Sequence, residues 1–303
     1  MRRQLWPAAA ACLLVAGCGA SGHEGPGGGE PGLPRPLSGA VHFSAAQAGA
    51  LHRSEEEQVR SCMRGRGHVY RAVPVSDPYR LVAENPYGLL DADRAREDGY
   101  GITAEQVVDR PQDPNASHLS ALSETDRTAW QKALVGDEKH HRTLTLPDGV
   151  KIRYDPRSCV QAASGAVFGK RWTELHHLME ALTNDIAGTV RKTPGFREAE
   201  QAWAGCMAEK GHTYRGLSDP RAETGRLLEK ADGDPAGQRS VGRTELTLAG
   251  DDLVCQQEAR LAEAAAEVQG DAERKSREKW RQEIEDHGAM KAAALAGLGR
   301  TAG

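Results

Sequence analysis

The residues best suited to chemistry in this sequence are His176, His177 and Glu180. His176 and Glu180 are four positions apart, so on a helix they share a face and could hold one edge of a metal site. His140–His141 could add ligands, although no spacing brings them close. The inverted zinc-protease pattern needs a histidine directly after the glutamate, and Ala181 stands there. Solvated helix histidines are therefore the favoured interpretation, and a metal site is the alternative.

Motifs of nucleophilic, nucleotide-binding and redox enzymes are missing or incomplete. The sequence has no Gly-x-Ser-x-Gly elbow and no Cys-x-x-Cys pair. Residues 165–171 resemble a P-loop, but the run is one residue short and ends in arginine where serine or threonine would bind magnesium. The favoured interpretation therefore has no catalytic centre and no cofactor.

Two stretches, residues 53–71 and 197–215, share Cys-Met followed by Gly-His-x-Tyr-Arg at the same spacing. This internal repeat predicts two modules of the same plan. The histidine and tyrosine of each copy could form a binding pair, and the favoured alternative is that they pack a helix end against a strand. These residues are His68 with Tyr70 and His212 with Tyr214.

The cysteines fit this repeat. Of six in the chain, Cys12 and Cys18 lie near the N-terminus, and an even set of four remains. In an exported protein such a set argues for two disulfides. Each copy contains a first cysteine and is followed by a second one, so the repeat predicts one bond per module. The predicted pairs are Cys62–Cys159 and Cys206–Cys255.

The N-terminus predicts export. Arg2 and Arg3 precede a dozen apolar residues, which are too few to span a membrane and are typical of a signal peptide covering residues 1–17. Residues 14–18 resemble a bacterial lipobox, whose cysteine, here Cys18, receives a lipid that anchors the chain to the membrane. A plain secretory signal with an accidental cysteine is the alternative. Residues 18–43 are rich in glycine and proline and predict a disordered tether.

The elements that would position these residues form a mainly α fold with small β-hairpins. The first module covers residues 44–194, with an insert at 79–141, and the second covers 195–303. For the first module we expect a helix capped by Ser44 and stopped at Gly67, a strand at 68–73, a hairpin turning at 147–149, and a helix that starts at Asp155-Pro156, breaks near Gly165 or Gly169 and runs to Val190.

Two more helices are expected. Ser123 begins a helix to Leu134 within the insert. A charged helix follows Cys255 to about His287, and the last dozen residues fray. We expect this terminal helix to dock on the body rather than to serve as a partner surface.

The combination of several motifs resembles a group of uncharacterised actinomycete-type secreted lipoproteins. The motifs are Gly-Tyr-Gly-Ile-Thr at 99–103, Asp-Pro-Asn at 113–115, the helix at 122–137 and the cysteine stretch at 202–214. The resemblance covers roughly residues 44–260 and implies an exported, disulfide-held helical body. It offers no catalytic residues to carry over, and the Pro-Asp-Gly hairpin and the long charged C-terminal helix depart from the pattern.

The composition limits the function. Hydrophobic residues make up 39% of the 303 residues and aromatic residues 5%, which favours helices with small-residue interfaces. The net charge of −4 comes from mixed charges, so no nucleic-acid partner is expected. We expect a non-catalytic envelope lipoprotein that binds an envelope protein, a cell-wall polymer or a small ligand. The alternative is an envelope hydrolase or metal-binding protein that uses His176 and Glu180.

Overall fold

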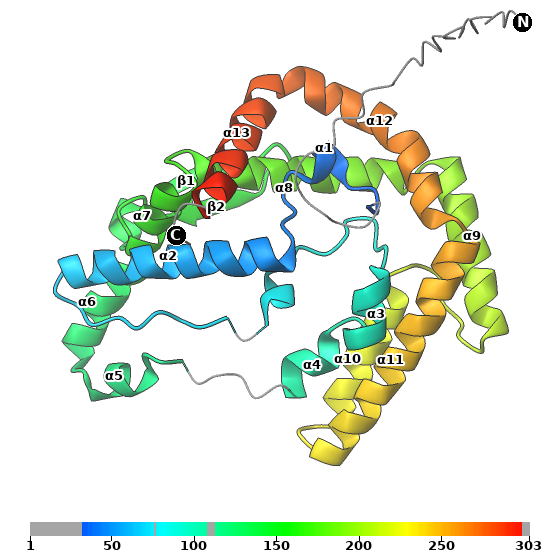
Figure 1. Ribbon diagram of the computed structural model, residues 1–303, viewed down its shortest axis with the longest axis horizontal. Helices are drawn as coiled ribbons and strands as arrows, with labels where there is room; N and C mark the ends of the chain where they lie inside the picture. Colours follow the sequence, from blue (N-terminus) through cyan, green and yellow to red (C-terminus); the bar gives the residue numbers. More distant parts are fainter. Residues whose placement is uncertain (1–31, 76, 108–112, 299–303) are drawn as a thin grey trace, which may run out of the picture. The chain divides into compact units, whose positions relative to one another are not determined.

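Helices account for 68% of this computed structural model, which describes residues 32–75, 77–107 and 113–298 (Figure 1). The helices are α1 (Pro36–Gly39), α2 (Ala45–Gly65), α3 (Ala92–Asp98), α4 (Ile102–Val107), α5 (Ala116–Ala121), α6 (Glu124–Val135), α7 (Cys159–Val167), α8 (Trp172–Val190), α9 (Pro194–Glu209), α10 (Asp219–Lys230), α11 (Pro235–Glu258), α12 (Leu261–Lys279) and α13 (Arg281–Leu298). Two short 3-10 helices, η1 (Pro78–Leu81) and η2 (Glu138–His140), and two strands, β1 (Arg142–Thr145) and β2 (Lys151–Tyr154), complete the elements. The predicted class, mainly α with a small hairpin, is confirmed.

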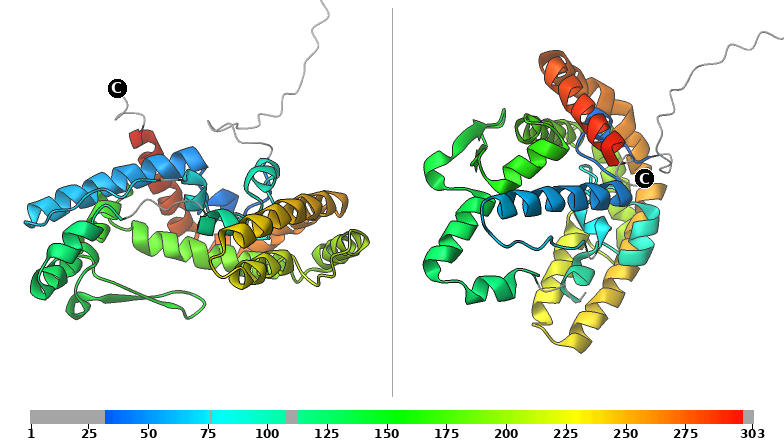
Figure 2. Two further views of the ribbon diagram at one scale, coloured as in Figure 1. Left: turned by 90° about the horizontal axis from the view of Figure 1, so that it is seen from below. Right: turned by 60° about the vertical axis from the view of Figure 1, so that its left-hand side comes forward.

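Local signals place several helix ends where the sequence predicts them. Ser44 caps α2 and forms a capping box with Gln47, and Gly67 takes the left-handed conformation just beyond the helix. Ser123 caps α6 by accepting the backbone N–H of Asp126 with its side chain. The antiparallel pair β1–β2 turns at residues 147–149 and stands apart from the helices along most of its length (Figure 2).

The start of the helix that carries Cys159 is three residues later than predicted. Ser158, rather than Asp155, is its N-cap. The Asp155 carboxylate instead accepts the backbone N–H groups of Asp137 and Arg157, which fixes a turn before the helix. The predicted break lies at Gly169, whose left-handed backbone separates α7 from α8.

The predicted strand at residues 68–73 is wrong. Side chains, rather than a partner strand, form the hydrogen bonds to the backbone N–H and carbonyl groups of this extended segment. Asn115, which is 1% exposed, accepts the N–H of Arg71 and donates to its carbonyl. Glu56 accepts the N–H of Val73 at 2.7 Å, and the Trp130 indole donates to the carbonyl of Val69. Asn115 of the Asp-Pro-Asn motif therefore holds the extended segment of the first repeat copy in place.

The structure contains the two disulfides that the repeat predicts, Cys62–Cys159 and Cys206–Cys255, each with a Cα–Cα distance of 5.5 Å. The first cysteines lie at equivalent places near the ends of α2 and α9. The second cysteines do not, since Cys159 opens α7 whereas Cys255 lies near the end of α11. The tripeptide Leu-Thr-Leu, which occurs at residues 144–146 and again at 246–248, begins in strand β1 at the first place and lies in helix α11 at the second. The repeat is therefore real for its first half only.

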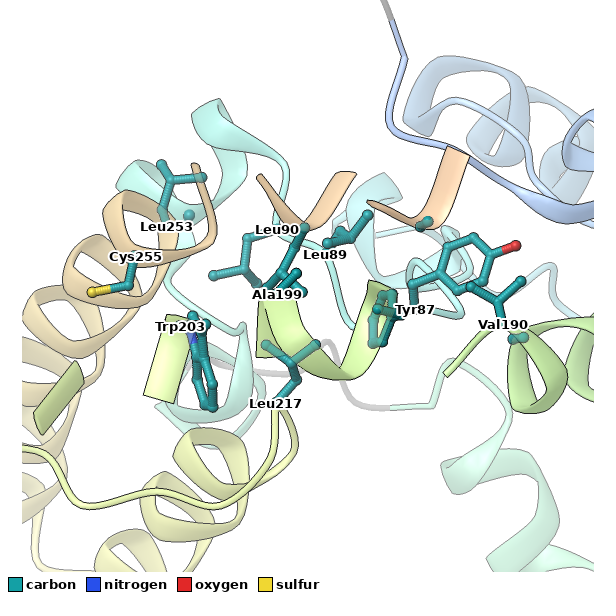
Figure 3. Close-up of a cluster of buried hydrophobic side chains, with 14 of the residues drawn as sticks. Tyr87, Leu89, Leu90, Val190, Ala199, Trp203, Leu217, Leu253 and Cys255 are labelled. Carbon is teal, nitrogen blue, oxygen red and sulfur yellow. The ribbon is translucent and has the colours of Figure 1, made fainter. Parts of the chain in front are cut away.

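Two buried clusters surround the disulfides. The smaller contains Val59, Met63, Trp130 and Cys159. The larger runs through α8, α9, α11 and α12 around the fully buried Trp203 and Phe196 (Figure 3).

The predicted insert is divided between these two clusters. Its residues Tyr87 to Tyr100 pack into the larger cluster, whereas Trp130 packs into the smaller one. Figure 3 shows Tyr87, Leu89 and Leu90 among side chains of the second predicted module. The proposed module boundaries therefore cut through shared cores, and from Leu33 onward the described residues form one compact unit.

Residues 33–43 are folded, which corrects the predicted extent of the tether. Leu37 is 4% exposed, and its N–H donates to the buried carboxylate of Glu273 at 2.8 Å. The ammonium of Lys291 binds the carbonyls of Gly39 and Ala40 at 2.8 and 3.1 Å. Burial of this segment between α8, α12 and α13 therefore overrides its glycine- and proline-rich composition (Figure 1). The predicted signal peptide, Cys18 and tether residues 18–31 lie outside the described residues.

The predicted terminal helix consists of three helical pieces. The chain kinks at Arg260, which takes a left-handed conformation between α11 and α12, and again at Trp280 between α12 and α13. Residues up to 298 are helical, so the predicted fraying is wrong for 292–298. The docking of α13 is through Ala294 and Met290 against Phe168 and Trp172. In the part of the chain that the structure describes, no helix is both long and apolar enough to cross a membrane.

Candidate functional site

A cavity of about 500 Å³ is the principal candidate site. Its wall is assembled from α1 and the turn after it, the loop at 83–88, the second half of α8, α9, the loop at 216–218 and the start of α10. This volume falls within the range of small-molecule binding pockets. None of the predicted histidine or tyrosine binding residues lines the cavity, and Glu180 is the only predicted site residue that does so.

The cavity is lined by three arginines and three glutamates. Each glutamate has a partner within the protein. Glu84 pairs with Arg221 at 2.8 Å, Glu180 accepts a hydrogen bond from His177 at 2.7 Å, and Glu200 accepts the N–H of Leu217 at 3.4 Å.

The other two arginines, Arg35 and Arg191, make no salt bridge to any acidic side chain of the described ranges. Burial lowers the pKa of Arg35, and the more distant Asp91 offsets this only in part. Arg35, Arg191 and Glu200 are therefore the charged side chains of the wall that have no ion pair among the described residues.

Two buried polar atoms of the wall lack a hydrogen-bond partner. The hydroxyl of Thr183 on α8 has none, although the residue is only 4% exposed, and Nδ1 of His42 has none either. Burial, together with the nearby charges of Arg35 and Lys291, lowers the pKa of His42 to about 4. The wall near His42 is therefore electropositive, and His42 is neutral at physiological pH. Buried polar atoms normally find a partner, so the Thr183 hydroxyl marks a place where a ligand group fits.

The predicted metal residues meet a third histidine that sequence reasoning missed. Nδ1 of His176 lies 3.2 Å from Nε2 of the fully buried His287 on α13, and both rings stack on Trp172. Glu180 is 3.7 Å from His176 but hydrogen-bonds His177, which lowers the pKa of Glu180. Among the residues that the structure describes, no three His, Cys, Asp or Glu side chains are arranged to hold a metal ion.

The remaining predicted residues differ between the two repeat copies. Tyr70 stacks on Trp130 and donates to Glu56, while Tyr214 stacks on Trp203 and donates to Glu223. His212 and Tyr214 also line a second cavity of about 300 Å³. Both tyrosines therefore have packing contacts. Each packs on a tryptophan, whereas the prediction had them packing a helix end against a strand.

His140–His141 lie at η2 and its C-cap, on the segment that leads into the hairpin. Neither residue takes part in the contacts of His176 or Glu180.

Comparisons with protein-family models, with curated proteins and with solved structures give no significant match. The resemblance to secreted lipoproteins therefore stays a prediction.

The buried histidine pair should make the protein sensitive to acid. Burial lowers the pKa of His287 from 6.5 to about 4, with smaller contributions from His176 and Lys291. Between these values the unfolded chain binds a proton that the folded chain excludes, so the stabilisation is complete above about pH 6.5 and is lost as the pH falls toward 4. We expect His287 alone to cost about 2 kcal/mol of unfolding free energy between about pH 7.5 and pH 5.

Urea unfolding at both pH values measures this loss. The variant His287→Gln keeps a polar side chain without the titration, so its loss over the same interval should be smaller by that amount. Equal losses in the two proteins would show that the ring is accessible to protons in the folded state.

Proposed function

We propose that this protein is an exported lipoprotein, held at the outer face of a membrane through Cys18, whose folded body has a non-catalytic binding role in the cell envelope. The observation that carries the proposal is the pair of disulfides in the body. Disulfides persist in oxidising compartments outside the cytoplasm and are rare inside it. The sequence pattern at residues 1–18 supports the same location independently.

The cavity supports a binding role over a purely structural one. A helical spacer needs no concave site, and leaving a buried hydroxyl such as that of Thr183 without a hydrogen-bond partner costs stability. A disulfide-held body with a preformed cavity suits capture of a ligand that reaches the envelope surface. The partners consistent with this role are a small molecule, an envelope protein or a cell-wall polymer.

Replacement of Cys18 tests the anchoring. Cys18→Ala should abolish lipidation, so the protein should appear in the medium or persist as an unprocessed precursor, because one folded domain without acyl chains has no stable hold on a bilayer. Cell fractionation and mass spectrometry of the N-terminal peptide measure this. Cys12→Ala is the matched control and should leave membrane attachment unchanged. A processed, membrane-bound Cys18→Ala protein would rule out the lipid anchor.

A further inference from the structure

We propose that the cavity beside α1 and α8 binds a small molecule carrying an oxyanion, either a carboxylate or a phosphate, through Arg35 and Arg191. The inference deepens the proposed binding role and rests on it, but it does not depend on the lipid anchor.

The charge arrangement is the first support. Arg221 already has Glu84 as a counter-ion, whereas the half-buried Arg35 and the exposed Arg191, which also line the cavity, have no ion pair among the described side chains. Guanidinium groups present a planar fork of donors that matches the oxygens of a carboxylate or phosphate. A bound oxyanion would supply the missing counter-charge.

An unpartnered hydroxyl is the second and independent support. The Thr183 hydroxyl is almost fully buried in the cavity wall without a hydrogen-bond partner. A hydroxyl can donate one hydrogen bond to an anionic oxygen. Arg35 precedes α1, Thr183 lies within α8 and Arg191 directly follows α8, so these donors come from two parts of the chain.

The backbone of the segment that carries Arg35 is fixed by the fold. Lys291 binds the carbonyls of the turn between α1 and α2, and Glu273 holds the N–H of Leu37 inside α1. Donors that are held in place before the ligand arrives lose little freedom on binding, which favours a specific site.

Isothermal titration of the full-length protein in detergent tests the inference, with citrate, inorganic phosphate and glycerol 3-phosphate as probes and glycerol as the neutral control. We expect saturable binding of at least one anionic probe and none of glycerol. Arg191→Gln should weaken that binding by about tenfold to a hundredfold, because it removes a charged donor. Lys192→Gln removes a neighbouring exposed cation outside the cavity and should leave binding unchanged.

Thr183→Val provides a second variant that should fold. It removes a buried hydroxyl that has no partner, so thermal stability should hold or rise while affinity falls severalfold. Equal weakening by Arg191→Gln and Lys192→Gln, or no saturable binding of any anionic probe, would overturn the inference.

Vesicles of phosphatidylglycerol distinguish the two sources of the oxyanion. Competition by vesicles assigns the oxyanion to a lipid headgroup, and competition by glycerol 3-phosphate alone assigns it to a free molecule. If the protein binds anions but is not attached to the membrane, the lipid anchor is refuted. If it is attached to the membrane but binds no anion, this site is refuted.

Discussion

Glu245→Ala should lower the free energy of unfolding by about 3–5 kcal/mol, the largest effect we expect from a single side chain. Glu245 on α11 is 2% exposed, and its carboxylate accepts the backbone N–H groups of Tyr100, Ile102 and Thr103 at 2.8–3.0 Å. Ile102 and Thr103 carry the orphan donors at the start of α4 and Tyr100 lies just before it, so the glutamate caps that helix from another part of the chain. Alanine would leave three buried donors without an acceptor.

Urea unfolding measures the loss, and hydrogen exchange locates it. The amides of residues 100–103 should exchange faster in Glu245→Ala, whereas Glu245→Gln should recover part of the stability because its amide oxygen still accepts. Glu229→Ala, at an exposed position of α10, is the matched control and should change the stability by less than about 0.5 kcal/mol. If Glu245→Ala lost no more free energy of unfolding than this control, the hydrogen bonds from Glu245 to the Gly-Tyr-Gly-Ile-Thr segment would not stabilise the fold.

Loss of the Cys62–Cys159 bond should destabilise the protein by about 2–5 kcal/mol. The bond joins residues 97 positions apart, and closing a loop of about 100 residues removes roughly 4.7 kcal/mol of unfolded-state entropy in the chain-entropy model. Cys159 is fully buried beside Met63 and Trp130, so the bond also joins α2 and α7 at the centre of the smaller cluster. Cys62→Ser should therefore shift the urea midpoint strongly downward.

Three measurements qualify this result. Cys159→Ser and the double variant should lose as much as Cys62→Ser, since each removes the same bond. Cys206→Ser should lower the free energy of unfolding by a similar amount, because closing its loop of 49 residues removes only slightly less entropy from the unfolded state. If the double variant were as stable as the native protein, the Cys62–Cys159 bond would contribute nothing to stability. The first repeat copy would then not depend on its disulfide.

Short-range signals account for what the sequence predicts well. The cap at Ser44, the cap at Ser123 and the turn at residues 147–149 each depend on residues a few positions apart. The repeat predicts the two cysteine pairs for the same reason, because it compares two local patterns. Its failure beyond the first half shows the limit, since the same Leu-Thr-Leu is a strand in β1 and helix in α11.

The candidate site was not predictable in this way because it depends on contacts between distant segments. Residues 33–43 have the composition of a linker, and only their burial by Glu273 and Lys291 makes them a wall of the cavity. Glu245 and Glu273 lie in charged stretches and look solvated in the sequence, yet they are 2% and 3% exposed. A periodicity can indicate which face of a helix is apolar, but it cannot identify which charged residue will be enclosed.

The attachment of α1 to the last two helices has a consequence for how the protein matures. The hydrogen bond from Leu37 to Glu273 spans 236 positions, and Lys291 reaches back across a still longer stretch. A chain threaded through a membrane with its N-terminus first exposes Arg35 and His42 long before α12 and α13 emerge. Contacts of such long range form slowly, after the local helices. If the protein is exported as proposed, the cavity is completed only when translocation is finished, and the proposed anion binding should then report a fully exported and folded chain.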